Sequence, residues 1–270
     1  MYTSGIISQD TVHLGDLSIE AQQFEEALEL RPAPGYWGNI FDGVLGLARP
    51  SASGTRNLLH PLSIMISQGL LDENVFGLRL PSDDNTGGEL TLGGTNKDSY
   101  SDDLVSIPTT NETDPWLHGK WTVEARSAWL GDGGSVNRNL SGYTAFFDSG
   151  YPLIDLPRSL ALDALKLIDA KPGNSLVLTV PCSKREKLPD LTFQLHDANI
   201  TLTAFDYTIK DDGECAVMID GHQEHEGSKP YLRLGSSFLK GLYSVFDIDR
   251  KTIGCKCATD SRTTRRKVHG

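Results

Sequence analysis

The sequence has no surplus of positive charge and no long apolar run. Its 270 residues carry 25 Lys and Arg against 36 Asp and Glu, which gives a formal net charge of −11. A nucleic-acid partner needs a basic face that neutralises phosphate groups, so this charge argues against one. A helix that spans a bilayer needs about 20 consecutive apolar residues, and the longest apolar runs here are far shorter. We therefore expect neither a nucleic-acid partner nor a membrane partner.

The first residues also lack the features of a secretory signal peptide. Met1 is followed directly by "YTSGIISQDTVHLG", which has no basic start, no apolar core and no small-residue cleavage site. The segment instead has the alternation and turn residues of a strand and a turn. We expect the chain either to be intracellular or to lack its natural start.

Cysteine is scarce, and its spacing does not indicate a metal site. Cys182 and Cys215 could close one disulfide, whereas Cys255 and Cys257 are alternate residues in an apparent strand and are poorly placed to bond each other. All four could instead be reduced, half-buried thiols. Zinc sites usually combine Cys-x-x-Cys with a second Cys or His pair, and these cysteines do not form that pattern. We expect no metal and no cofactor.

Three Asn-x-Ser/Thr triplets lie in polar stretches of the sequence. They begin at Asn111, Asn139 and Asn199. Such triplets accept N-linked glycans on the surface of secreted proteins. Their presence favours a secreted glycoprotein, in contrast to the missing signal peptide.

Signals for strands and turns are abundant. The 27 Gly and 13 Pro favour β structure with frequent turns. Apolar residues alternate at Val12, Leu14, Leu17 and Ile19, interrupted by a turn at Gly15. Other segments with alternation or a hairpin pattern are 75–94 with a turn at 81–88, 175–182, 190–195, and 243–258 with a turn at 249–251.

Two segments have the pattern of short helices. Residues 60–71 have Pro61 near the start and Gly69 near the end, the usual placement of these residues in a helix. Residues 159–173 have Ser159 as the expected N-cap, and Pro172 ends the helix. The fold class that we expect is therefore dominated by β structure, with a few short helices.

An acidic turn interrupts the apolar segment "TAFFDSGYPLID" at residues 144–155. A carboxylate at the end of an apolar strand is costly unless its oxygens find donors. Gly150 lets amide groups approach Asp148, and the Ser149 hydroxyl can brace the turn. Asp-Ser-Gly is also a common turn tripeptide, so the triplet alone does not separate a catalytic turn from a structural one.

Taken together, several segments in a fixed order resemble the pepsin-like aspartic proteases over nearly the whole chain. The segments are "SQDTVHLG", "FDGVLGL", "LSIMISQGLL", "VFGLRL", "GELTLGG", "FFDSG", "LPRS", "LPDLTFQL" and "LGSSFLKGLYSVFDIDRKTIG". The resemblance implies a bilobal β fold with a cleft between the lobes. We expect residues 1–107 to be the remainder of an incomplete N-terminal lobe and residues 108–270 to be the C-terminal lobe.

The resemblance also implies a chemistry. Each lobe of this family supplies one aspartate from an Asp-Thr/Ser-Gly turn, and the pair activates a water molecule that attacks a peptide carbonyl. Asp148 matches the aspartate of the second lobe, supported by Ser149 and Gly150. Cys182 and Cys215 match the disulfide of that lobe. The resemblance further implies a polypeptide substrate or peptide ligand, a secreted or vacuolar location, and a monomer when the chain is complete.

The sequence departs from the family pattern at the catalytic turns. Only one Asp-Thr/Ser-Gly turn occurs in the 270 residues, and the spacing of the repeated elements would place its partner before Met1. Tyr151 and Pro152 follow the turn where a hydroxyl residue and Ser are usual, and Arg233 replaces a usual aliphatic residue. Together with Phe146, Tyr151 and Arg233 are expected to line the cleft.

These departures leave more than one function open. The chain could be an aspartic endopeptidase in which Asp148 is one of two catalytic acids. It could instead be a catalytically inactive peptide-binding protein on a protease scaffold, or a product that does not fold alone. One carboxylate cannot both act as the base for water and hold the complementary proton, so we expect the chain as written to be inactive.

Overall fold

In the computed structural model the chain forms two compact units, Met1–Glu73 and Asn74–Gly270. The residues that the structure describes are 2–31, 42–49, 58–81, 87–100, 103–131, 134–173, 177–211, 213–225, 227–258 and 267–269.

The first unit is built on a long antiparallel ribbon of strands β1 (Tyr2–Leu14) and β2 (Leu17–Arg31). The predicted turn between them is confirmed: Gly15 has a φ of 57°, which glycine adopts without steric cost. Helix α1 (Pro61–Ser67) packs on β2 and begins at its proline, as predicted. The Gln68 side chain anchors the helix end, because its Nε2 donates to the Glu20 carbonyl at 2.8 Å and its Oε1 accepts from the Glu20 amide at 3.2 Å.

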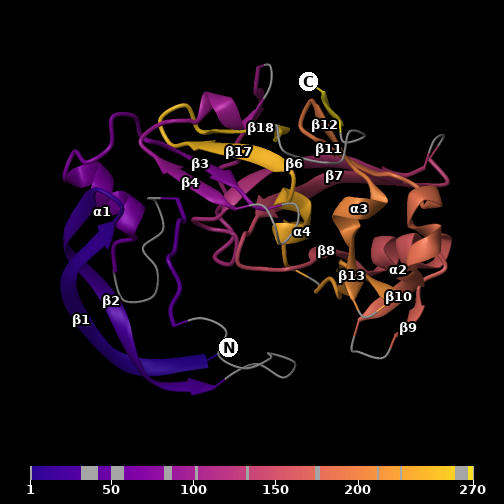
Figure 1. The fold of residues 1–270 in the computed structure, drawn as a ribbon, viewed down its shortest axis with the longest axis horizontal. Coiled ribbons are helices and arrows are strands. Elements are labelled where there is room, and N and C mark those ends of the chain that lie inside the picture. The colour runs from indigo at the N-terminus through magenta and orange to yellow at the C-terminus, as the bar shows by residue number, and fades with distance from the viewer. Residues whose placement is uncertain are drawn as a thin grey trace. The chain divides into compact units, whose positions relative to one another are not determined.

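The second unit contains a five-stranded sheet that joins residues from far apart in the sequence. Figure 1 shows the magenta strands β3 and β4 beside the yellow strand β17. The order is β4-β3-β17-β18-β5, with strands β3 (Val75–Arg79), β4 (Glu89–Leu92), β5 (Val105–Pro108), β17 (Leu242–Asp247) and β18 (Thr252–Cys257). Phe76 and Phe246 stack on this sheet with ring centroids 4.6 Å apart. The two predicted hairpins, β3–β4 and β17–β18, are confirmed.

An eight-stranded sheet forms the larger part of the second unit. Its order is β15-β8-β16-β7-β6-β11-β12-β19. The strands are β6 (Trp121–Leu130), β7 (Val136–Phe147), β8 (Ile154–Pro157), β11 (Leu191–Leu195), β12 (Ala198–Leu202), β15 (Ile219–His222), β16 (Tyr231–Leu234) and β19 (Lys267–His269). Apolar residues alternate along β11 and β12, and one face of these strands is buried. Strand β16 lies between β7 and β8, and it pairs with β7 in parallel and with β8 antiparallel.

A four-stranded sheet, β13-β14-β10-β9, and the remaining helices complete the second unit. The strands are β9 (Lys171–Pro172), β10 (Leu178–Pro181), β13 (Thr208–Asp211) and β14 (Glu214–Val217), the helices are α2 (Arg158–Leu167), α3 (Ala204–Tyr207) and α4 (Ser236–Leu239), and 3-10 turns are at Lys97–Ser99 and Cys182–Lys187. The predicted disulfide between Cys182 and Cys215 is present and ties a 3-10 turn to β14. A fold dominated by β structure with a few short helices is therefore confirmed.

One local expectation was wrong. Helix α2 begins at Arg158 with Pro157 as its N-cap, so Ser159 lies inside the helix and does not cap it. Near the C-terminus, Lys267–His269 forms strand β19 on β12. Burial of Val268, which is 6% exposed, gives that short strand a contribution from apolar packing.

Candidate active site

Asp148 follows the last residue of β7, as the acidic turn predicted. Its amide donates to the Leu234 carbonyl at 3.0 Å, because β16 runs parallel to β7 at this point. The Gly150 amide donates to Asp148 Oδ1 at 3.1 Å, which closes the Asp-Ser-Gly turn. The side chain of Asp148 is 28% exposed, so the turn presents its carboxylate to solvent at the end of a buried strand.

The segment after the turn is fixed by the start of helix α4. The Ser236 amide donates to the Tyr151 carbonyl at 2.6 Å, and the Ser237 hydroxyl donates to the Pro152 carbonyl at 2.6 Å. A Cβ atom on Gly235 would lie 2.1 Å from the Leu153 carbonyl oxygen and 2.3 Å from that of Tyr151. Only glycine allows this close approach of two backbone segments.

Arg233 forms an ion pair with Asp148. Its Nε and Nη2 lie 2.8 Å and 2.6 Å from Asp148 Oδ2. Both side chains are less than one third exposed, at 30% for Arg233 and 28% for Asp148. Charge-assisted hydrogen bonds of this length are the stronger kind. Sequence reasoning placed Arg233 near the cleft, and the structure brings it into direct contact with the candidate catalytic carboxylate.

The ring of Tyr151 packs against the Arg233 guanidinium. The Arg233 Cζ atom lies 3.9 Å from the centroid of the Tyr151 ring, and the Tyr151 hydroxyl donates to Asp220 Oδ2 at 3.3 Å. Burial, followed by the carboxylates of Asp155 and Asp220, raises the pKa of Tyr151 above its usual value. Tyr151 therefore stays neutral and acts as a platform for the cation.

Aromatic residues form the wall beside this ion pair. Phe146 is buried at 1% exposed and packs edge-on against Trp116, with centroids 5.1 Å apart. Trp116 is 46% exposed and also contacts Tyr231 at 4.5 Å. The Lys120 ammonium lies over Trp116, 4.6 Å from its centroid. Sequence reasoning missed Trp116, Lys120 and Tyr231, because only the folded register places them near Asp148.

Asp155 was also not identified from the sequence as a residue near this site. Asp155 on β8 contacts His222 on β15, with Oδ1 and Nδ1 2.9 Å apart, and the imidazole stacks on Tyr231 at 4.0 Å between centroids. The signal in the sequence was an acidic residue inside the apolar run "PLIDLP". A charge in such a run needs a partner, and here the partner is a histidine on the neighbouring strand.

The predicted site residues of the turn and the cleft lie together. Asp148 and Gly150 bond to each other within the turn, and Ser149 lies between them in the chain. Arg233 packs against both Phe146 and Tyr151. Within the described ranges, no group of three or more His, Cys, Asp or Glu residues could hold a metal ion.

The glycosylation triplets differ in their surroundings. Asn111 and Asn139 are exposed, whereas Asn199 is half-buried in β12 and its Oδ1 is a buried atom without a partner in the described residues. Glycosylation at all three positions stays a prediction.

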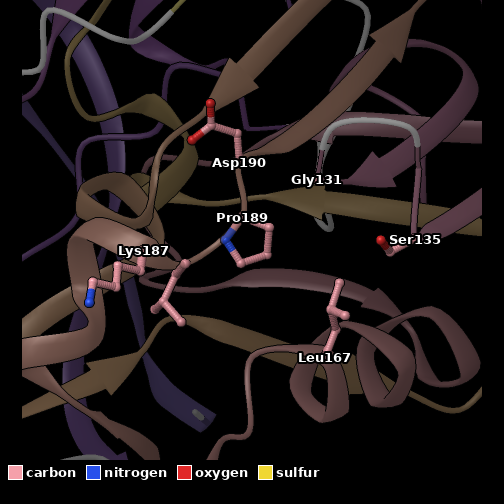
Figure 2. Close-up of a pocket in the computed structure, with 7 residues that line it drawn as sticks. Gly131, Ser135, Leu167, Lys187, Pro189 and Asp190 are labelled. Atoms are coloured by element: carbon pink, nitrogen blue, oxygen red, sulfur yellow. The ribbon is translucent and has the colours of Figure 1, made fainter.

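A shallow pocket is present at the other end of the β6–β7 hairpin. Figure 2 shows Leu167 and Pro189 lining it, together with the polar side chains of Lys187 and Asp190. Its volume is about 400 Å³. The strand register pairs Leu130 with Val136 at the pocket end and Trp121 with Phe147 at the end near Asp148. The pocket is therefore separate from the candidate site.

The fold and the Asp-Ser-Gly turn define an aspartic protease scaffold. The model of the family "Eukaryotic aspartyl protease" matches residues 2–258, and the chain belongs to this family. An aspartic proteinase from Irpex lacteus has the same fold, with a TM-score of 0.82 and 21% identity over 97% of this chain and 80% of that one. No described helix is long and apolar enough to cross a membrane.

Several curated proteins are similar to this chain in sequence. Vacuolar protease A of Aspergillus fumigatus is 35% identical over 93% of this chain and 61% of its own length. Vacuolar aspartic protease of Candida albicans is 33% identical over 93% of this chain and 58% of its own length. Gastricsin of Mus musculus is 28% identical over 93% and 62%. The chain thus spans about three fifths of the length of the curated relatives it matches.

Proposed function

We propose that the chain carries part of a pepsin-like aspartic endopeptidase, with Asp148 as the catalytic aspartate of the C-terminal lobe. The observation that supports this is the position of the partly exposed Asp148 carboxylate at the end of β7, in a turn that the Gly150 amide closes on Oδ1. In this chemistry a carboxylate polarises water for attack on a peptide carbonyl. Ser149 and Gly150 hold the turn, Tyr151 and Arg233 line the cleft, and the buried Phe146 packs behind Arg233.

The lobes in this proposal are residues 1–107 and 108–270. Strand β5 ends at Pro108, and Thr109 then bridges to Val123 of β6. The chain therefore passes at this point from the five-stranded to the eight-stranded sheet, which supports the boundary. The first lobe would be incomplete, and Asp148 would be the only catalytic aspartate within these 270 residues.

A second candidate function is peptide binding without hydrolysis. Arg233 favours it, because its guanidinium occupies the carboxylate oxygen that would otherwise contact water or substrate. A carboxylate oxygen that already accepts hydrogen bonds from a guanidinium has less room to accept from water or substrate. The fold holds extended polypeptides with or without chemistry, since function depends on the site and not on the scaffold.

We also propose a location, partners and an oligomeric state for the protein. Relatives named as vacuolar proteases and as gastricsin support a vacuolar or secreted location, and polypeptides as substrates or ligands. We propose a monomer without a cofactor. Glycans at Asn111 and Asn139 would suit a secretory route, since both side chains are exposed.

A cleavage assay at acid pH separates the two functions. The purified chain is incubated with an acid-denatured protein between pH 3 and 5, beside the variant Asp148→Asn, and the fragments are read by mass spectrometry. Cleavage that is lost in Asp148→Asn supports the endopeptidase. Saturable binding of an extended peptide without cleavage supports the second candidate. Cleavage that survives Asp148→Asn rejects the role of Asp148, and the absence of both binding and cleavage rejects both functions.

A further inference from the structure

Lys120 is held directly beside the candidate catalytic turn. It ends the turn at residues 114–120, in which the Asp114 carboxylate accepts from the Trp116 amide at 2.8 Å. Strand β6 begins at the next residue, and Trp121 pairs with Phe147 of β7. The antiparallel register therefore places Lys120 across the hairpin from Asp148.

The Lys120 ammonium has aromatic neighbours and no anionic partner in the described part of the chain. Its Nζ lies 4.6 Å from the Trp116 centroid and 5.4 Å from the Phe146 centroid. No described carboxylate is within 4.0 Å of it. Burial of the half-buried side chain lowers the pKa of Lys120, although the Asp148 charge opposes this and the Arg233 charge adds to it. The site thus contains a cation that is partly removed from water and lacks an ion pair.

The carboxylates of the site already have hydrogen-bond or ion-pair partners. Asp148 Oδ2 accepts from both Nε and Nη2 of Arg233. Asp155 contacts His222, and Asp220 accepts from Tyr151. Two cations therefore face the one carboxylate of Asp148. An incoming carboxylate would balance the second cation.

We propose that Lys120 and the exposed face of Trp116 form a subsite for an acidic side chain of a bound polypeptide. This inference rests on the proposed function, because it assumes that a polypeptide lies along the cleft at Asp148. The ammonium would donate to the carboxylate of Asp or Glu, and the indole would pack on its methylene groups. A neutral side chain of the same shape would leave the ammonium without an ion pair. The subsite therefore discriminates by charge.

The test uses two sets of fluorescent eight-residue peptides. In one set a single Glu is placed at each position in turn, and in the other set a Gln is placed at the same position. Binding to the whole chain is measured at pH 6 by anisotropy. At one position we expect Glu to bind about tenfold more tightly than Gln, the effect of a single charge-assisted contact. The preference should disappear near pH 3, where the peptide carboxyl, with a pKa of about 4.3, takes up a proton.

Variants assign the preference to this residue. Lys120→Met should remove the preference, so that Glu and Gln peptides bind with equal affinity, and Lys120→Arg should retain it. Lys210→Met, an exposed lysine on β13, makes the same charge change elsewhere and should have no effect. Equal binding of Glu and Gln peptides by the wild-type chain at every position overturns the subsite, and so does a preference that survives Lys120→Met. The proposed function fails separately, if no peptide of either set binds.

Discussion

Arg233 binds Asp148 through two nitrogens that converge on one oxygen, with Nε at 2.8 Å and Nη2 at 2.6 Å from Oδ2. The other oxygen, Oδ1, accepts from the Gly150 amide inside the turn. Both oxygens of the carboxylate therefore have a donor from the protein itself. A hydroxyl or a water molecule that approaches Oδ2 must compete with a guanidinium that Tyr151 also holds in place.

Replacing this arginine should expose the carboxylate at small cost to stability. In Arg233→Leu, the loss of a partly exposed ion pair should change the free energy of unfolding by about 1 kcal/mol or less. Oδ2 becomes free to accept a hydroxyl, so we expect a statine-type peptide to bind about tenfold more tightly than to the wild-type chain. Isothermal titration calorimetry measures the affinity, and thermal denaturation measures the stability.

The double variant Arg233→Leu with Asp148→Asn is the control for this gain. This variant keeps the space that the shorter leucine side chain leaves and replaces the Asp148 carboxylate by a neutral amide. The gain in affinity for the statine-type peptide should therefore be lost. Equal affinity of the wild-type chain and Arg233→Leu would show that the guanidinium does not obstruct Asp148.

Gly235 should tolerate no side chain. In Gly235→Ala the new Cβ would meet the carbonyl oxygens of Leu153 and Tyr151 at 2.1 Å and 2.3 Å, and backbone atoms cannot move aside as a flexible side chain can. Overpacking of this kind costs roughly 3 kcal/mol. We expect a melting temperature lower by several degrees, measured by circular dichroism. Gly94→Ala, where no atom lies within 4 Å, is the matched control and should melt with the wild-type chain.

The elements of the fold were predictable where a local pattern determines them. The turn at Gly15 and the hairpin β17–β18 follow from alternation and turn residues, and both are confirmed. Helix α1 begins at its proline as expected. The start of α2 was not predictable in this way, because Pro157 takes the capping position ahead of Ser159.

The contacts of the site depend on long-range register, which a single sequence does not show. Arg233 reaches Asp148 because β16 runs parallel to β7 and pairs Arg233 with Phe146. The position of Asp148 at the end of a strand was predicted, because a carboxylate at the end of an apolar run needs solvent or hydrogen-bond donors and so marks the point where the buried strand ends. Its neighbour Lys120 was missed, because its position is set by the pairing of β6 with β7 and no motif marks it.

Glu112 should make the second unit sensitive to acid. Its side chain is 4% exposed and accepts from Lys229 at 2.6 Å, Thr110 at 2.7 Å and Thr144 at 2.9 Å. Burial alone would raise the pKa of Glu112, but these donors outweigh it and hold the pKa below its usual 4.5. A lowered pKa means that the stabilisation is complete above pH 4.5 and is lost as the pH falls through the lower, folded value.

The variant Glu112→Gln measures this contribution. At pH 7 we expect it to be less stable than the wild-type chain by about 2 kcal/mol, because the buried pair with Lys229 is lost while the partly exposed lysine can still reach water. The difference should narrow below pH 4.5, as recorded by urea denaturation along a pH series. Glu214→Gln, an exposed position on β14, should show no such pH dependence. A difference that is constant from pH 7 to pH 3 would contradict this assignment.

The disulfide should contribute to stability mainly through the unfolded chain. Cys182 and Cys215 are separated by 33 residues, and a cross-link of that length lowers the entropy of the unfolded state by an equivalent of about 3–4 kcal/mol. The double variant Cys182→Ser with Cys215→Ser should therefore melt roughly 10 °C lower, a shift typical for a unit of this size. Differential scanning calorimetry with and without a reductant measures it. The reductant should lower the melting temperature of the wild-type chain and leave the variant unchanged, since Cys255 and Cys257 form no disulfide that it could break. If the wild-type chain melts at the same temperature in both conditions, the cross-link does not stabilise the fold.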